Sequence, residues 1–291
     1  MKVYDKVKLF YSEFKGEKGL IGKSVQNRPI YFFNVKKSEY PKIIVVGAIH
    51  GREHVTALLV LKLIRYFSRY NRSGNVFFIP LANPDGVVIS ENYQPLYKAN
   101  ANGVDLNVNF DAKWGQGEFN KRSRGGENYV GPFPFSEPES KALKKFTQFV
   151  GPDLTISYHS KGEEIYYEFY QSEIDRKRDY AFANIAQKLT GYKIKTLTNS
   201  VGGYKDWCIQ EFKIPALTIE VGNDCLVHPI LQEEVYKIFN ENKRLLGALI
   251  KELKRKNGKI YAIGDKRGAK SVKKRRSANR SNNRKRRSNI I

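Results

Sequence analysis

The sequence contains little cysteine and no long apolar run. Its two cysteines, Cys208 and Cys225, form no C-x-x-C pair and no Cys/His cluster surrounds them. We therefore expect no disulfide framework, and two cysteines are too few for a cysteine zinc site. No apolar stretch approaches the roughly 20 residues that a membrane-spanning helix needs. The first 15 residues alternate charged and apolar side chains and lack the apolar core of a secretory signal. We therefore expect a cytoplasmic protein without a membrane span, with association with the cell wall as the open alternative.

Acidic residues are also scarce, and the resulting positive charge is uneven. The 291 residues carry 52 lysines and arginines against 29 acids, a net charge of +23. Residues 265–291 hold 12 of these cations against one acid, a net of +11, and contain almost no aliphatic side chains. Such a segment cannot bury enough apolar surface to fold. We expect a disordered basic tail that could bind a polyanion, either nucleic acid or a cell-wall polymer.

The remaining sequence alternates between patterns typical of strands and of helices. A continuous β-branched run at 42–47 predicts a strand buried on both faces, and apolar residues at helical spacing follow it at 55–67. The other expected elements are strands at 31–35, 76–79, 153–158 and 216–221, helices at 4–14, 138–150, 180–190 and 235–253, and a turn at 83–86. This alternation predicts one α/β domain over residues 1–264, with a mixed, mostly parallel central sheet and helices on both faces.

Three polar residues share one context, because each follows an expected strand or lies near its end. These are His50, His159 and Glu220, and in open α/β sheets the carboxyl ends of strands form the ligand-binding edge. Glu53 comes three residues after His50, so an imidazole and a carboxylate can face one ion. With His159 they would form the set of two histidines and one carboxylate that is typical of catalytic zinc. A single strand-end histidine is more often structural, so the prediction depends on the combination.

Six short motifs follow one another between residues 20 and 222. They are I-G-K-S at 21–24 with R-P-I at 28–30, G-A-I-H-G-R-E at 47–53, N-P-D-G at 83–86, N-G-V-D-L-N at 102–107, Y-H-S at 158–160, and G-G-Y-K-D-W at 202–207 with T-I-E at 218–220. In this order they resemble the M14 family of zinc carboxypeptidases, which includes carboxypeptidase A and bacterial cell-wall peptidases. The resemblance implies one Zn²⁺ per chain, held by His50, Glu53 and His159.

The same resemblance implies roles for residues around the metal. Glu220 matches the catalytic glutamate, a general base that takes a proton from water and passes it to the leaving amine. The oxyanion needs a cationic donor, and Lys98 or Arg52 is the candidate, because Lys98 lies where the family has an arginine and Arg52 matches a substrate-contacting arginine. Asn107 matches the asparagine that helps to hold the terminal carboxylate of the substrate.

Two positions depart from the family pattern. Exopeptidases of the family have an arginine directly after the asparagine, where this chain has Val108. Either Arg122 or Arg124 replaces that arginine, or the enzyme needs no free terminal carboxylate, as in an endopeptidase. The substrate-covering tyrosine of the family is also not at its expected place, and Tyr204 is the candidate to replace it.

Lys205 aligns with the position that selects the side chain beyond the cut. A lysine there favours a carboxylate, and bacterial relatives with similar Y-K-D-W motifs cleave the γ-D-glutamyl–diaminopimelate bond of murein peptides. The sequence therefore predicts a zinc-dependent peptide hydrolase, most similar in its motifs to those enzymes. Two alternatives stay open: an ordinary metallocarboxypeptidase acting on protein C-termini, and a non-catalytic, polyanion-binding module. A nucleic-acid-binding protein is supported by charge alone, because no zinc finger, RNA-recognition motif or phosphate loop is present.

Overall fold

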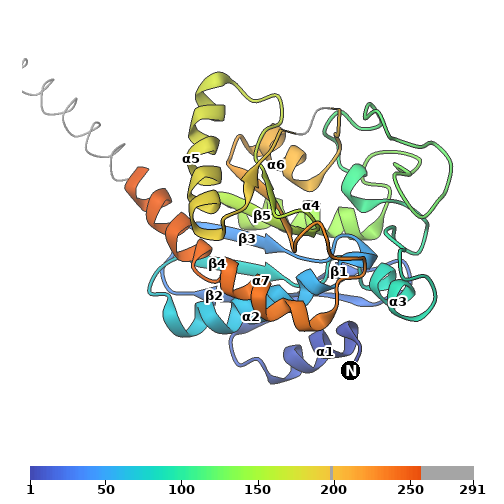
Figure 1. Ribbon diagram of the computed structural model, residues 1–291, viewed down its shortest axis with the longest axis horizontal. Helices are drawn as coiled ribbons and strands as arrows, with labels where there is room; N and C mark the ends of the chain where they lie inside the picture. The colour runs from blue at the N-terminus through green and yellow to red at the C-terminus, as the bar shows by residue number, and fades with distance from the viewer. Residues whose placement is uncertain (197–198, 257–291) are drawn as a thin grey trace, which may run out of the picture. The chain divides into compact units, whose positions relative to one another are not determined.

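The computed structural model describes residues 1–196 and 199–256, and residues 1–250 form one compact unit around an eight-stranded sheet (Figure 1). The strands are β1 (Glu17–Lys23), β2 (Pro29–Lys36), β3 (Lys42–Val46), β4 (Asn75–Ile79), β5 (Leu154–Ser160), β6 (Glu164–Tyr166), β7 (Lys193–Ile194) and β8 (Ala216–Val221). Their spatial order is β1-β2-β4-β3-β5-β8-β6-β7. The four central strands β4, β3, β5 and β8 run parallel, and antiparallel pairs flank them.

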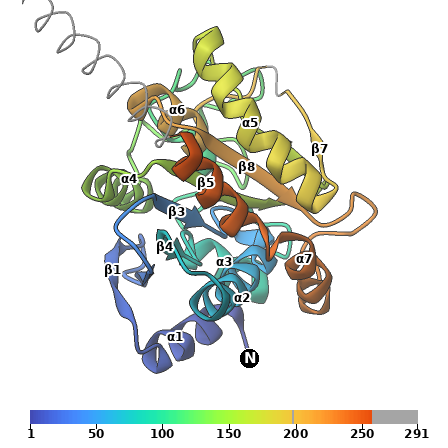
Figure 2. The same cartoon turned by 90° about the vertical axis from the view of Figure 1, so that its left-hand side faces the viewer.

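Helices cover both faces of this sheet (Figure 2). They are α1 (Val3–Glu13), α2 (Val55–Tyr70), α3 (Pro84–Asn92), α4 (Pro138–Val150), α5 (Glu173–Thr190), α6 (Tyr204–Phe212) and α7 (Val235–Asn242), with short 3-10 turns η1 (Gly51–Glu53), η2 (Leu106–Val108) and η3 (Gln232–Glu234). On one face Ile44 and Val46 pack into a core with Phe146 of α4 and Trp207 of α6. Because successive strand residues point to opposite faces, the buried Val45 of β3 faces the α2 side. The expected α/β class with a mixed, mostly parallel sheet is confirmed.

Most expected elements lie where the sequence pattern places them, with three differences. Residues 83–86 are not an isolated turn, because Asn83 caps α3 by accepting a hydrogen bond from the Gly86 amide at 2.8 Å. The expected helix at 235–253 is interrupted by a turn at 243–244. Strands β1, β6 and β7 were not expected, since two of them are very short and β1 contains two glycines. Local pattern is weakest where strands are short and lie toward the margins of the sheet.

Two expectations fall partly beyond the described residues. The boundary between the domain and the basic tail at 264–265, and the tail itself, lie outside them. Within the described part of the chain, no helix is both long and apolar enough to cross a membrane.

Candidate metal centre

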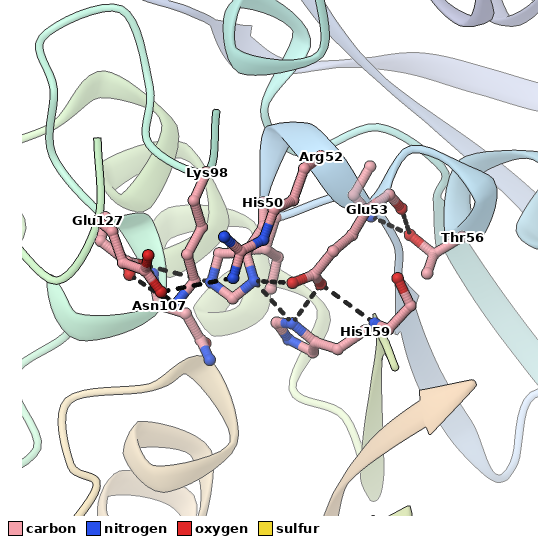
Figure 3. A network of polar contacts seen from close by, with 12 residues as sticks. His50, Arg52, Glu53, Thr56, Lys98, Asn107, Glu127 and His159 are labelled. Atoms are coloured by element: carbon pink, nitrogen blue, oxygen red, sulfur yellow. Dashed lines mark hydrogen bonds and ion pairs between the residues drawn. The ribbon is translucent and has the colours of Figure 1, made fainter. Parts of the chain in front are cut away.

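The turn between β3 and α2 holds two of the predicted metal ligands on a rigid backbone. His50 precedes η1, and Glu53 ends it. The Thr56 hydroxyl accepts a hydrogen bond from the Ala48 amide at 2.7 Å and donates one to the Glu53 carbonyl at 2.8 Å, which closes the turn (Figure 3). A Cβ atom on Gly51 would lie 2.4 Å from the Gly86 carbonyl oxygen, so only glycine fits where this turn meets α3.

The side chains of His50, Glu53 and His159 converge on one buried point (Figure 3). The His50 Nδ1 atom lies 2.7 Å from Glu53 Oε1, and the His159 Nδ1 atom lies 3.1 Å from Glu53 Oε2. The two Nδ1 atoms are 3.2 Å apart. Residues from two strand ends, 109 positions apart in the chain, are therefore brought within bonding distance of a shared centre.

This arrangement fits a divalent cation. Two imidazole nitrogens and a carboxylate oxygen all lie within 4.8 Å of one another, and no other such group of histidine, cysteine or acidic side chains occurs among the described residues. Nitrogen and carboxylate donors in a set of two histidines and one glutamate suit zinc with an open coordination position. The three side chains are all buried, and converging lone pairs in such a setting need a positive charge between them.

Two buried carboxyl groups near this point, those of Glu53 and Asp105, have their pKa values lowered by neighbouring histidine and lysine side chains. Burial alone would raise the pKa of the Glu53 carboxyl, but His50 and His159 hold it well below its usual range. Asp105 lies behind His50, with its Oδ1 atom 3.2 Å from His50 Nε2, and its Oδ2 atom lies 2.9 Å from Lys98 Nζ. Lys98 and His50 keep the pKa of the buried Asp105 well below its ordinary value. Asp105 therefore stays ionised beside His50, in the position that carboxylates take behind metal-binding histidines.

Glu220 lies beside the centre because β5 and β8 pair in parallel. His159 and Glu220 are register partners on these neighbouring strands, so their side chains lie on the same face. Burial raises the pKa of the Glu220 carboxyl to about 8, against the lowering effect of His159. Without a bound cation this carboxyl holds its proton at neutral pH. A divalent ion at the centre would favour the ionised form.

A hollow of about 390 Å³ opens on the centre, and most of the other predicted site residues line it. His50, Glu220, Lys98, Asn107 and Lys205 all line it. The Asn107 side-chain oxygen accepts a hydrogen bond from the Tyr204 amide at 3.1 Å. The Lys205 ammonium donates to the Glu168 carbonyl oxygen at 2.6 Å and to Asp206 Oδ1 at 2.5 Å. It is thus a buried cation with one carboxylate partner.

Two predicted substrate residues do not line this hollow. Tyr204 is fully buried, and its hydroxyl bonds to Thr147 at 2.9 Å within the core between α6 and α4. The expectation that Tyr204 covers the substrate is therefore wrong: at the first position of α6 only its backbone faces the site. Arg52 does not line the hollow, and its guanidinium lies 3.4 Å from Glu127.

The cations considered as replacements at the Val108 position are not in the hollow either. Arg122 stacks over Trp114 at 4.5 Å and donates to the Gly115 carbonyl, and neither it nor Arg124 lines the hollow. Among the described residues that line it, the cationic side chains other than histidine are Lys98 and Lys205.

Sequence reasoning missed two acids of this network. Asp105 supports both His50 and Lys98, and Glu127 lies within ion-pair distance of Arg52 and 3.9 Å from Lys98. Asp105 stands inside the N-G-V-D-L-N segment, so a search for a carboxylate partner to each metal-binding histidine could have found it. No local pattern marks Glu127, which lies in an irregular loop.

Comparison with known proteins agrees with this geometry. The profile described as "Zinc carboxypeptidase" matches residues 15–242. A γ-D-glutamyl-L-diamino acid endopeptidase of Lysinibacillus sphaericus is 29% identical over 193 residues, which cover 59% of this chain and 48% of that protein. Murein peptide amidase A of Escherichia coli is 30% identical over 145 residues, 47% of this chain and 57% of that protein. The chain thus spans only about half the length of these relatives.

Solved structures show the same fold. Bovine thrombin-activatable fibrinolysis inhibitor, solved in complex with tick carboxypeptidase inhibitor, superposes with a TM-score of 0.77 at 22% identity, covering 88% of this chain and 98% of that one. The family profile extends over most of the chain and includes every residue of the centre described above. This protein belongs to the M14 family of zinc carboxypeptidases.

Proposed function

We propose that this chain hydrolyses the γ-D-glutamyl–diaminopimelate bond of murein peptides with one bound Zn²⁺ and Glu220 as general base. The observation that carries the proposal is one hollow lined both by Glu220 and the metal-ligand candidate His50 and by the buried cation Lys205. The first two supply hydrolytic chemistry, and the third supplies a preference for a substrate carboxylate. The names of the relatives from Lysinibacillus and Escherichia coli support the same substrate class.

Each of these residues has a separate role in the proposed reaction. His50, Glu53 and His159 would hold the zinc, which when bound lowers the pKa of a water molecule and polarises a carbonyl. Glu220 accepts the proton of the attacking water and donates it to the departing amine. Lys98, held by Asp105 at 2.9 Å, places an ammonium beside the developing oxyanion.

Lys205 and Asn107 would bind the substrate beyond the cut. Diaminopimelate carries a carboxylate on its side chain, which the Lys205 ammonium can pair with in a buried setting. The Asp206 carboxylate neutralises part of the positive charge of the Lys205 ammonium. The pocket therefore matches a substrate group with one negative charge rather than two. The side-chain oxygen of Asn107 accepts a hydrogen bond from the Tyr204 amide. Its side-chain NH2 group can therefore donate a hydrogen bond to the substrate.

Two alternatives remain as outcomes of the test. Ordinary trimming of protein C-termini is disfavoured because Val108 stands where an arginine would clamp the terminal carboxylate, and no arginine lines the hollow among the described residues. A non-catalytic module is disfavoured because His50, Glu53 and His159 form a group that could hold a metal ion, and Glu220 lines the same hollow as His50.

The decisive experiment measures bound zinc and hydrolysis of L-alanyl-γ-D-glutamyl-diaminopimelate. We expect His159→Ala to lose both metal and activity, whereas Glu220→Gln should keep the metal and lose at least a hundredfold in kcat, the range for removing a general base. Metal-loaded wild type that leaves the tripeptide and simple peptides intact would contradict the enzymatic proposal.

Substrate choice has its own comparison. Lys205→Met should raise KM for the tripeptide while leaving hydrolysis of a peptide with an uncharged residue beyond the cut unchanged or improved. Lys213→Met, at an exposed position just after α6, is the matched control. If Lys205→Met lost the same fraction of kcat/KM on both substrates, Lys205 would not recognise the substrate carboxylate. The assignment of the hydrolytic residues would be unaffected.

A further inference from the structure

Apart from the metal centre, three adjoining hollows are lined by residues of α2 together with residues of α1 or α7. Figure 2 shows where these three helices lie in the fold. The hollows have volumes of about 430, 360 and 430 Å³, and Arg65 lines all three. We call them together the α2 groove. Helix α2 packs against both α1 and α7. The first hollow shares Phe10 and Glu13 with the second and Lys62 with the third, so the three adjoin one another. None of the residues that line them lines the hollow at the metal centre.

The α2 groove is strongly cationic. Lys62, Arg65 and Arg69 follow one another at spacings of three and four, which places them on one side of α2 over about 10 Å of helix. Helix α2 contains no acidic residue, and within the described chain none of the three cations forms an ion pair. The groove as a whole is lined by six cations against two acids: Lys6, Lys15, Lys62, Arg65, Arg69 and Lys243 against Glu13 and Glu233.

Aromatic rings are interleaved with these cations. The Lys62 ammonium lies 3.6 Å from the ring centre of Tyr236, and Arg69 lies 5.5 Å from that of Tyr70. Both rings are exposed, Tyr236 to 65% and Tyr70 to 56%. Tyr66 packs against Tyr70 with ring centres 4.7 Å apart, which supports the exposed ring from beneath. Tyr70 and Tyr236 therefore present exposed aromatic faces next to cations that form no ion pair within the described chain.

We propose that the α2 groove binds single-stranded nucleic acid. Lys62, Arg65 and Arg69 would neutralise successive phosphates, and Tyr70 and Tyr236 would stack on bases. A positive groove with aromatic platforms is how proteins bind single strands without reading sequence. A duplex fits less well, because its bases are already stacked on one another. A bare polyphosphate would use the cations and leave the exposed rings unused.

The test uses the full chain and a fluorescent 20-nucleotide oligothymidine, with binding followed by anisotropy across a salt series. Replacing Lys62, Arg65 and Arg69 together by glutamine should weaken binding at least tenfold at 0.1 M salt. It should also reduce the slope of log K against log salt by about 2, since each phosphate contact on a single strand contributes roughly 0.7.

A matched control removes equal charge from the opposite face of the sheet. Lys141, Lys144 and Lys145 of α4, replaced together by glutamine, should leave affinity and slope near those of the wild type. Because residues 257–291 are present in both variants, their charge cannot cause the difference. An equal loss in both triple variants would mean that only net charge matters and would overturn the proposal.

The proposed stacking of bases on Tyr70 and Tyr236 is tested separately with Tyr70→Ala and Tyr236→Ala. Each should weaken oligothymidine binding about fivefold or more and leave binding of inorganic polyphosphate unchanged. Equal loss for both ligands, or tighter binding to phosphatidylglycerol vesicles than to the oligonucleotide, would overturn the assignment to nucleic acid. Photo-crosslinked iodouracil oligonucleotides should label peptides that contain Tyr70 or Tyr236, and labelling confined to residues 257–291 would also overturn it. Unchanged bound zinc in every variant verifies the fold.

Discussion

Buried carboxylates in this protein differ in whether a cation faces them. Asp105 is fully buried, but Lys98 lies 2.9 Å from it and keeps its pKa well below the ordinary value. Glu139, at the start of α4, is equally buried and has only neutral donors, the Val25 amide at 3.1 Å and the Asn100 side chain at 3.0 Å. Burial raises the pKa of Glu139 to about 7. The first carboxylate serves the metal centre, and the second makes stability depend on pH.

Glu139 should make the protein less stable as pH rises toward neutrality. Its folded pKa of about 7 exceeds the unfolded value of 4.5, so its contribution is complete below pH 4.5 and is lost as pH rises through 7. The shift corresponds to a loss on the order of 3 kcal/mol. Urea unfolding of Glu139→Gln between pH 5 and 8 should show a flatter pH dependence than that of wild type.

The Glu139→Gln variant also loses a hydrogen bond, but that cost is the same at every pH. Glu211→Gln changes an exposed acid of α6 and should keep the wild-type profile. A Glu139→Gln profile as steep as that of wild type would show that other groups cause the pH dependence.

At the scale of elements, the metal turn depends on the start of α3. The Asn83 side-chain oxygen caps this helix, while its amide group donates to the Ile49 and Ala99 carbonyl oxygens, each at 3.1 Å. One buried side chain therefore joins α3, the residue before His50 and the loop that leads to Lys98. The N-P-D-G motif, expected as a turn, is in fact a capped helix start that supports the site.

Replacing Asn83 by alanine should destabilise the protein by about 2–4 kcal/mol, because it removes a buried cap and leaves two carbonyl groups without a donor. Chemical unfolding measures this loss, and zinc affinity should fall with it because Ile49 directly precedes the metal-ligand candidate His50. Asn92→Ala, which removes an exposed bond to the Val88 carbonyl, should cost less than about 0.5 kcal/mol. Comparable losses in the two variants would remove the special role of Asn83.

At the scale of the whole molecule, the metal centre joins segments that are distant in the chain. His50 and Glu53 follow β3 and His159 ends β5, and these two strands are direct neighbours in the sheet. The side chains of His50, Glu53 and His159 therefore meet at one edge of the sheet with their lone pairs converging. A bound ion stabilises the folded chain because the unfolded chain has no preformed site.

Zinc at 100 times its dissociation constant should stabilise the protein by about 2.7 kcal/mol. For a domain of this size the melting temperature should rise by roughly 5–10 °C, and a chelator should reverse the rise. Differential scanning calorimetry of wild type and His159→Ala separates site binding from surface effects, since the variant lacks one ligand. A similar rise in both proteins would contradict this.

The sequence alone determined the fold class, the family and the identity of the metal-binding candidates. Buried parallel strands leave continuous β-branched runs, and the motifs around His50 and His159 are local in the chain. Only the tertiary structure decided the burial of Tyr204 and the pairing of Asp105 with both His50 and Lys98. It also decided the gathering of α1, α2 and α7 around one cationic groove. All three features depend on which faces of distant elements pack together, and this cannot be predicted from the spacing of residues along the chain.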